Sequence, residues 1–258
     1  MTTRPKFLRP FWRYYGGKWR AAPRYPAPMY RTIVEPFAGA AGYAMRYYTH
    51  DVVLVEKYPV VAEIWRYLIS ADPQEIRATP AGIVHVDELP AWVPQGLRHL
   101  IGFSMNAATV SPCRSLSAGQ KKLLAAGHTT QGWSTGMRER VASQVQHIRH
   151  WKLIEGDYTA APDIEATWFV DPPYSNRAGS YYVHSDIDYN TLARWCERRV
   201  GQVLVCENEG AQWLPFKPFA VFKAGVNGKG SREVLWAGGL RNQQRGAILE
   251  RWTRGATE

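Results

Sequence analysis

Four consecutive residues, Asp171-Pro172-Pro173-Tyr174, combine a carboxylate, carbonyl acceptors and an aromatic ring on a rigid stretch of chain. Each proline fixes its own φ, restricts the residue before it and removes a backbone donor. Asp171 is therefore held at the end of a predicted strand, beside carbonyl groups that are available to accept hydrogen bonds. A nucleobase that has left its stack and carries an exocyclic amine needs such acceptors and a ring to stack on. The motif favours a site for an amine-bearing base, and the competing interpretation is a strand that ends in a rigid turn.

A turn of small residues, Gly39-Ala40-Ala41-Gly42, comes after the first predicted strand, and Glu56 ends the second predicted strand. In open α/β sheets, ligands bind beyond the carboxyl ends of the strands, where small residues let a ligand approach the backbone. An acid after the second strand can accept hydrogen bonds from both hydroxyls of a ribose. The pair predicts a site for a cofactor that contains adenosine. A tight strand-to-helix connection and an exposed loop charge are the alternative explanations of the two features.

The elements that position these residues follow an α/β pattern. The opening unit is a strand, a turn, a helix and a strand, as expected for the start of a sheet with helical crossovers. A helical region follows and strand signals then return, so the sheet is begun, interrupted and completed. The predicted strands are Thr32–Glu35, Val52–Val55, Thr167–Val170, Gln202–Cys206, Phe219–Lys223 and Glu233–Trp236. The predicted helices are Tyr43–Tyr48, Val60–Ile69, Leu97–Met105, Ser117–Ala126, Met137–Trp151 and Tyr189–Val200.

The composition is that of a globular and strongly basic protein. The chain has 258 residues, a formal net charge of +10 and an isoelectric point near 9.6. Such a charge favours a polyanionic partner, and nucleic acid is favoured over a membrane because no long apolar run or lipidation motif occurs. Cys113, Cys196 and Cys206 form no disulfide or metal-binding pattern, so we expect no metal and a reducing cytoplasm. No obligate protein partner is indicated.

Taken in order, the motifs resemble those of the Dam-type family of DNA adenine methyltransferases. Gly16-Gly17-Lys18 comes first, Phe37-Ala38-Gly39 second, the helical region third and Asp171–Tyr174 last. The resemblance implies a Rossmann-like methyltransferase sheet with helices on both faces and an inserted, mainly helical target-recognition lobe. Residues 1–58 and 152–258 would form the catalytic domain, and residues 59–151 the lobe. It also implies S-adenosyl-L-methionine as cofactor, double-stranded DNA as partner, and a cytoplasmic enzyme of a bacterial cell or phage-infected host, with or without a cognate restriction enzyme.

The resemblance also assigns roles to residues by position. Asp171 would bind the target amine and Tyr174 would stack on the flipped base. Lys18 would contact the cofactor and lie near the base, Glu56 would hold the ribose, and Asp157 would help to bind the adenine of the cofactor. The predicted catalytic set is Asp171, Pro172, Pro173 and Tyr174. The predicted cofactor-binding set is Tyr14, Gly17, Lys18, Glu35, Pro36, Phe37, Ala38, Gly39, Glu56, Asp157, Tyr158 and Asp171.

Three positions differ from the usual pattern of the family. Tyr14 stands where tryptophan is more common, Glu56 where aspartate is common, and Ala41 where a second glycine is frequent. Each substitution keeps the functional group that the site requires, so we expect an active enzyme.

Basic and aromatic residues near the motif are candidates for DNA contacts. Segment 175–188 is polar and follows the motif directly, which favours a mobile lid over an ordinary surface loop. Lys229 and Arg232 lie among glycines, where a phosphate contact and a plain hairpin turn are both compatible with the sequence. The predicted DNA-binding set is Arg138, Arg177, Tyr181, Tyr182, Lys229 and Arg232.

The resemblance implies methyl transfer to the exocyclic 6-amino group of adenine. Two alternatives stay open: a catalytically inactive nucleic-acid-binding protein of the same fold, and an enzyme that methylates the amine of cytosine. Asp171 favours adenine, because enzymes that methylate the amine of cytosine usually have serine at the corresponding position. The compact helical region leads to the hypothesis of a relaxed or short target sequence.

Overall fold

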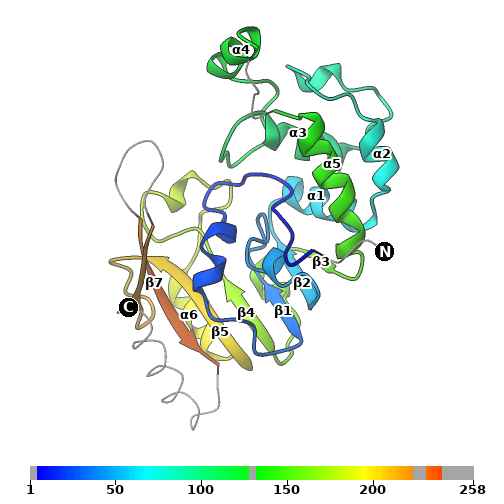
Figure 1. Cartoon of the computed structure of the whole chain (residues 1–258). Helices are drawn as coiled ribbons and strands as arrows, with labels where there is room; N and C mark the ends of the chain where they lie inside the picture. Colours follow the sequence, from blue (N-terminus) through cyan, green and yellow to red (C-terminus); the bar gives the residue numbers. More distant parts are fainter. Residues whose placement is uncertain (1–4, 128–131, 223–230, 240–258) are drawn as a thin grey trace.

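The computed structural model describes residues 5–127, 132–222 and 231–239. Their strands form one seven-stranded sheet in the order β3-β2-β1-β4-β5-β7-β6 (Figure 1). The first five strands in this order are parallel, and β7 is antiparallel to both β5 and β6. The strands are β1 (Thr32–Glu35), β2 (Asp51–Glu56), β3 (Lys152–Glu155), β4 (Ala166–Val170), β5 (Gly201–Asn208), β6 (Lys217–Phe222) and β7 (Ser231–Gly238). This is the Rossmann-like α/β sheet that the sequence predicted.

Alternate side chains of the strands point to opposite faces of the sheet and enter two hydrophobic cores. On β5, Leu204 and Cys206 join one core, whereas Val203 and Val205 join the other. Helix α6 (Tyr189–Glu197) covers the second core. The N-terminal segment and helices α1 (Pro59–Ser70) and α3 (Gln95–Met105) cover the first core. Helices therefore lie on both faces of the sheet, as predicted.

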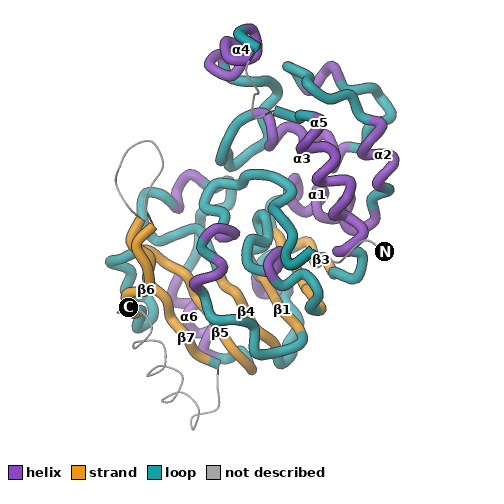
Figure 2. The backbone as a smooth tube through the Cα atoms, viewed as in Figure 1, coloured by secondary structure: helices purple, strands orange, loops and turns teal. Residues whose placement is uncertain are grey.

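The chain between β2 and β3 is mainly helical (Figure 2). Helix α1 contacts β2, β3 and α3, so the first core runs from the sheet into the helical region without a break. Helices α2 (Pro73–Ala78) and α5 (Thr135–Gln144) pack together beside them. Helix α4 (Ala118–Ala125) stands at the outer end of this region, far from the sheet in Figure 1, and none of its residues is buried. No helix within these described residues has the length and apolar character needed to cross a membrane.

The predicted helix Tyr43–Tyr48 is wrong, because the chain there forms a single 3-10 turn, Ala44–Arg46. The ring of Tyr43 stacks on Phe169 with 4.3 Å between the ring centroids, and its hydroxyl donates to the Pro26 carbonyl at 2.6 Å. Tyr47 already leaves helical geometry, with φ −118° and ψ 33°. Tertiary packing of the aromatic side chains therefore outweighs the local helical pattern.

Two further helices are shorter than predicted. Helix α5 ends at Gln144 and a 3-10 helix, Val145–Ile148, replaces the rest of the predicted Met137–Trp151. That change brings the Trp151 indole to the Tyr48 carbonyl, at 3.1 Å. Helix α6 ends at Glu197 rather than Val200. Neither α2 nor the edge strand β3 was predicted, and β3 is only partly buried and therefore has no clear alternation.

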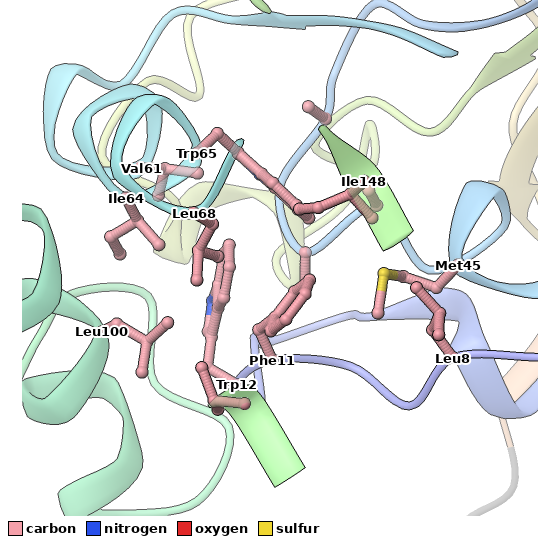
Figure 3. Close-up of a cluster of buried hydrophobic side chains, with 14 of the residues drawn as sticks. Leu8, Phe11, Trp12, Met45, Val61, Ile64, Trp65, Leu68, Leu100 and Ile148 are labelled. Carbon is pink, nitrogen blue, oxygen red and sulfur yellow. The ribbon is translucent and has the colours of Figure 1, made fainter. Parts of the chain in front are cut away.

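The N-terminal segment carries three large side chains into the first core (Figure 3). Leu8, Phe11 and Trp12 are at most 1% exposed. The ring of Trp65 on α1 lies 5.2 Å from that of Trp12 and 5.9 Å from that of Phe11, between centroids. This packing fixes the chain just before residue 14 and so holds residues 14–18 against the sheet.

Candidate active site

A pocket of about 860 Å³, partly open to solvent, lies at the carboxyl ends of β1, β2 and β4. The strand order reverses between β1 and β4, and open α/β sheets bind ligands at such a switch point. The N-terminal loop and the segment after β4 complete the walls. The twelve residues predicted to bind the cofactor all line this pocket: Tyr14, Gly17, Lys18, Glu35, Pro36, Phe37, Ala38, Gly39, Glu56, Asp157, Tyr158 and Asp171.

Glu56 ends β2 with its carboxylate directed at two backbone amides. One oxygen accepts from Gly39 and the other from Tyr58, each at 2.8 Å. Burial raises the pKa of Glu56 to about 7, although the hydrogen bonds from Tyr58 and Gly39 oppose that effect. The carboxylate thus joins the turn after β1 to the start of α1 and forms part of the pocket wall.

The turn after β1 allows a ligand to approach the backbone closely at Gly39, which has no side chain. Gly39 has φ +45°, and a Cβ added there would lie 3.1 Å from Cδ1 of Tyr14. Ala41 also has positive φ, 47°, a conformation that favours glycine. Glycine would therefore fit the backbone at position 41 better than the alanine that this chain has there.

Aromatic rings and an acid form the wall near β3. Phe37 and Tyr158 stack with 5.4 Å between their ring centroids. Asp157 caps a 3-10 helix, Tyr158–Ala160, by accepting from the Thr159 amide at 3.2 Å. Its second oxygen lies 3.3 Å from the Lys57 ammonium. The cap orients Asp157 at the pocket, where it can accept hydrogen bonds from a ligand.

Lys18 and Asp171 form a buried ion pair where the N-terminal loop meets the end of β4. The two side chains are 7% and 19% exposed, and Nζ of Lys18 lies 2.9 Å from Oδ1 of Asp171. Nζ also donates to the Gly16 carbonyl at 3.1 Å and lies 4.7 Å from the centroid of the Tyr174 ring. The motif and the glycine–lysine segment, more than 150 residues apart in the chain by the residue numbers, therefore form one site.

The two prolines of the motif differ in their surroundings. Pro173 lines the pocket, and its carbonyl accepts from the Tyr189 hydroxyl at 2.7 Å. Pro172 is buried, and no described residue donates a hydrogen bond to its carbonyl. Tyr174 lies beside the pocket rather than in its lining, and its buried hydroxyl has no hydrogen-bond partner among the described residues. Of the predicted catalytic set, Asp171 and Pro173 therefore face the pocket directly.

Burial dominates the protonation of the acids in the pocket. It raises the pKa of Asp171 to about 6, although Lys18 opposes this shift, and it raises that of Glu35 to about 8. Burial lowers the pKa of Lys18, but the carboxylate of Asp171 and other nearby groups outweigh it, so the pKa of Lys18 is raised well above its usual value. At neutral pH the site therefore contains an ammonium and an aspartate carboxylate.

The segment after the motif folds over the pocket. Its residues Tyr182, Val183, His184, Asp186 and Ile187 line the pocket. The Tyr182 hydroxyl donates to the Tyr15 carbonyl at 2.9 Å, and Gly179 approaches Tyr174 so closely that an added Cβ would lie 1.9 Å from the Tyr174 carbonyl oxygen. The segment predicted as a lid therefore rests on the N-terminal loop and on the motif itself.

The residues predicted to contact DNA have different surroundings. Arg177 and Arg232 are exposed, and Tyr181 is 53% exposed. Tyr182 lines the pocket instead, and the Arg138 guanidinium donates to the Thr79 carbonyl. Lys229 and most of the glycine-containing stretch around it lie outside the described residues.

Two buried acids near the motif fall outside the predicted site sets. Glu233 on β7 lies 3.9 Å from the Lys18 ammonium and accepts a hydrogen bond from the Tyr25 hydroxyl. Glu207 at the end of β5, where the sequence allows both an acid that borders the pocket and an ordinary turn, is fully buried and accepts from the Ser175 amide at 2.9 Å, which orients the chain after the motif. An acid within an apolar strand is the signal that could have identified Glu233. In the ranges that the structure describes, no group of three or more histidine, cysteine or acidic side chains is placed to hold a metal.

Comparison with known proteins does not identify the function. No protein-family model matches the chain, and no curated protein matches it. Among solved structures, the chain is similar to yhhF of Escherichia coli, which carries a provisional description as a methyltransferase. The two are 10% identical with a TM-score of 0.32, over 81% of this chain and 76% of that one. A similarity of this size supports no conclusion, so the function has to be argued from the chemistry of the pocket.

Proposed function

We propose that this chain transfers a methyl group from S-adenosyl-L-methionine to the exocyclic 6-amino group of adenine in DNA. The observation that carries the proposal is the buried carboxylate of Asp171 at the inner end of the pocket, 2.9 Å from the ammonium of Lys18. A carboxylate there can accept a hydrogen bond from an exocyclic amine, and the Pro172 carbonyl beside it offers a second hydrogen-bond acceptor.

The lining of the pocket fits S-adenosyl-L-methionine in its chemistry. Glu56 would accept the ribose hydroxyls, and Asp157 with the rings of Phe37 and Tyr158 would hold the adenine. Gly39 leaves space that a Cβ would fill, next to the Tyr14 ring. Tyr182 and the rest of its segment would exclude water from the reacting atoms.

When bound, the cofactor supplies an electrophilic methyl group on its sulfonium, so no metal and no covalent enzyme intermediate is needed. The amine of adenine is a poor nucleophile because its lone pair is delocalised into the ring. Asp171 and the Pro172 carbonyl would accept hydrogen bonds from its two N–H groups and favour a tetrahedral nitrogen with the lone pair directed at the methyl group. Asp171 would then take the proton that the methylated nitrogen loses, and the cofactor would leave as the neutral thioether. Tyr174, next to Lys18, would support the base. Catalysis would consist of positioning and electrostatic stabilisation in a pocket that excludes water.

Residues 59–151 would form the lobe that reads DNA, with residues 1–58 and 152–258 as the catalytic domain. Within the region, the stretch 89–138 contains no aspartate or glutamate and includes two adjacent lysines, Lys121 and Lys122, on the exposed helix α4. Such a stretch suits a phosphate backbone. The short lobe favours a relaxed or short target sequence, and a map of methylated adenines with one strict motif of four or more bases would argue against this.

The direct test is methyl transfer from labelled S-adenosyl-L-methionine to unmodified duplex DNA by the wild-type protein and by Asp171→Ala. We expect incorporation by the wild type and a loss of about 10²–10³-fold or more in the variant. DNA binding without cofactor binding would favour an inactive nucleic-acid-binding protein. Label on cytosine would favour the cytosine-amine alternative.

A further inference from the structure

Lys18 lies near a second carboxylate, which comes from a different part of the fold. Glu233 is 9% exposed, and its Oε1 lies 3.9 Å from the Lys18 ammonium. Asp171 lies on the same ammonium at 2.9 Å. The ammonium therefore has two possible counter-charges, and their distances from it differ by about one ångström. The nearer is Asp171, which follows β4, and the farther is Glu233 on β7.

Glu233 is itself held in place by an aromatic anchor. The Tyr25 hydroxyl donates to its other oxygen, Oε2. The Tyr25 ring stacks on Phe219 at 4.7 Å and meets Phe169 edge-on at 5.1 Å, between centroids, so the hydroxyl is fixed. Oε1 of Glu233 is thereby left to face Lys18.

In the proposed reaction, a lysine placed between two carboxylates can move from one to the other. An ammonium on Oδ1 of Asp171 weakens the hydrogen bond that this carboxylate can accept from the amine of the base. Moving Lys18 off Asp171 would leave a buried ammonium without a counter-charge, which is costly unless another anion is within reach. Glu233 supplies that anion at a distance that needs only a small movement of the lysine side chain.

We propose that Glu233 is a positioning residue that receives the ammonium of Lys18 when the amine of the target base engages Asp171. The inference rests on the proposed function for the identity of the incoming amine. The coupling between the three charged side chains is present whatever the substrate is.

The electrostatic coupling between the three side chains can be measured as a change in the pKa of Asp171, and its direction follows from the charges. Burial raises the pKa of Asp171, Lys18 lowers it, and Glu233 and Glu207 raise it further. Removing the charge of Glu233 therefore lowers the pKa of Asp171, and removing that of Lys18 raises it. The other titratable groups with electrostatic coupling to Asp171 are Glu35, Tyr25, Tyr174, Tyr182 and Cys206.

The test compares Glu233→Gln, Glu233→Asp, Tyr25→Phe and Lys18→Met with the wild type. The titration of Asp171 is followed by NMR on protein labelled with ¹³C at the aspartate carboxyl carbons, with Asp171→Asn to assign the signal. We expect Glu233→Gln to lower the midpoint by about half a pH unit or more and Lys18→Met to raise it. Glu233→Asp, which keeps the charge, should stay near the wild-type midpoint.

The same variants are then compared in single-turnover methyl transfer as a function of pH. Glu233→Gln should slow the step by roughly tenfold and move its acid limb to lower pH, and Tyr25→Phe should give a smaller change in the same direction. Because the NMR titration needs no substrate, it decides the coupling even if the wild type methylates no adenine, which would refute only the proposed function. An unchanged Asp171 midpoint in folded Glu233→Gln, or an unchanged single-turnover rate in an active wild-type background, overturns the proposal.

Discussion

The carboxylate of Glu56 accepts a hydrogen bond from the backbone amide of Gly39 at 2.8 Å. This bond joins the end of β2 to the turn after β1, the two places from which the pocket is built. Glu56 uses its other oxygen for the Tyr58 amide. Each oxygen still has a free lone pair, so the residue can organise the pocket and accept a ligand hydroxyl at the same time.

Replacing Glu56 with glutamine should weaken cofactor binding by about tenfold or more, since hydrogen bonds to a charged group contribute about 1.5–3 kcal/mol. The amide group of glutamine would also turn an N–H donor toward one of the two backbone donors. Calorimetry with S-adenosyl-L-methionine measures the effect. Asp51→Asn, at the exposed opposite end of β2, is the matched control and should bind as the wild type does. Equal affinity in both variants would remove Glu56 from the binding site.

Cofactor affinity should depend on pH near neutrality. The pKa of Glu56 is about 7 because burial disfavours its charge, and a ligand that donates hydrogen bonds prefers the carboxylate form. The dissociation constant should therefore rise as the pH falls from about 8 to about 6. In Glu56→Gln this part of the pH dependence should disappear. A dissociation constant that is flat with pH in the wild type would show that no proton leaves on binding.

Replacing Glu35 with glutamine should stabilise the protein at high pH. Burial raises the pKa of Glu35 to about 8, above the value of an unfolded chain. Its contribution to stability is complete below the unfolded pKa and is lost as the pH rises through about 8. Glutamine keeps the acceptor for the Ala44 amide, which Glu35 now binds at 2.6 Å, without this loss.

Denaturant unfolding at two pH values tests this prediction for Glu35→Gln. The variant should match the wild type at about pH 5 and exceed it by on the order of 2 kcal/mol at about pH 9. A variant that is less stable than the wild type at both pH values would contradict the prediction.

Removing the two lysines of α4 should weaken DNA binding without affecting the cofactor. Lys121→Gln with Lys122→Gln should raise the dissociation constant several-fold and reduce the salt slope by about one to two. Fluorescence anisotropy at several salt concentrations measures both. Arg31→Gln, next to the amino end of β1, changes the charge at the end of the strands opposite the pocket and should have little effect. If the control and the double variant behaved alike, α4 would not contact DNA.

The central strands could be predicted because they are buried on both faces. Mainly apolar runs mark β1, β4 and β5, and each run ends at a turn or an acid that marks its boundary. Elements whose geometry depends on tertiary contacts could not be predicted. The turn at Ala44–Arg46 follows from the packing of Tyr43 on Phe169, which no local pattern contains.

The candidate site was predictable where the motif order brought residues together. The pocket lining contains every residue of the predicted cofactor-binding set. Glu233 and Tyr25 were missed because they reach Lys18 from β7 and from an irregular N-terminal segment. Tyr182 was assigned to DNA on the basis of its position after the motif, whereas its contact with Tyr15 places it over the pocket. The positions of these side chains depend on how the loops cross the sheet, and this cannot be predicted from the spacing of residues in the sequence.

The most direct measurement is the chemical identity of the methylated nucleoside. Unmodified duplex DNA is incubated with the purified wild-type protein and S-adenosyl-L-methionine, digested to nucleosides and analysed by mass spectrometry, with Asp171→Ala in parallel. The proposed function predicts N6-methyladenine from the wild type and none from Asp171→Ala. N4-methylcytosine as the product, or no methylated nucleoside from a wild-type protein that is folded and binds the cofactor, would contradict it.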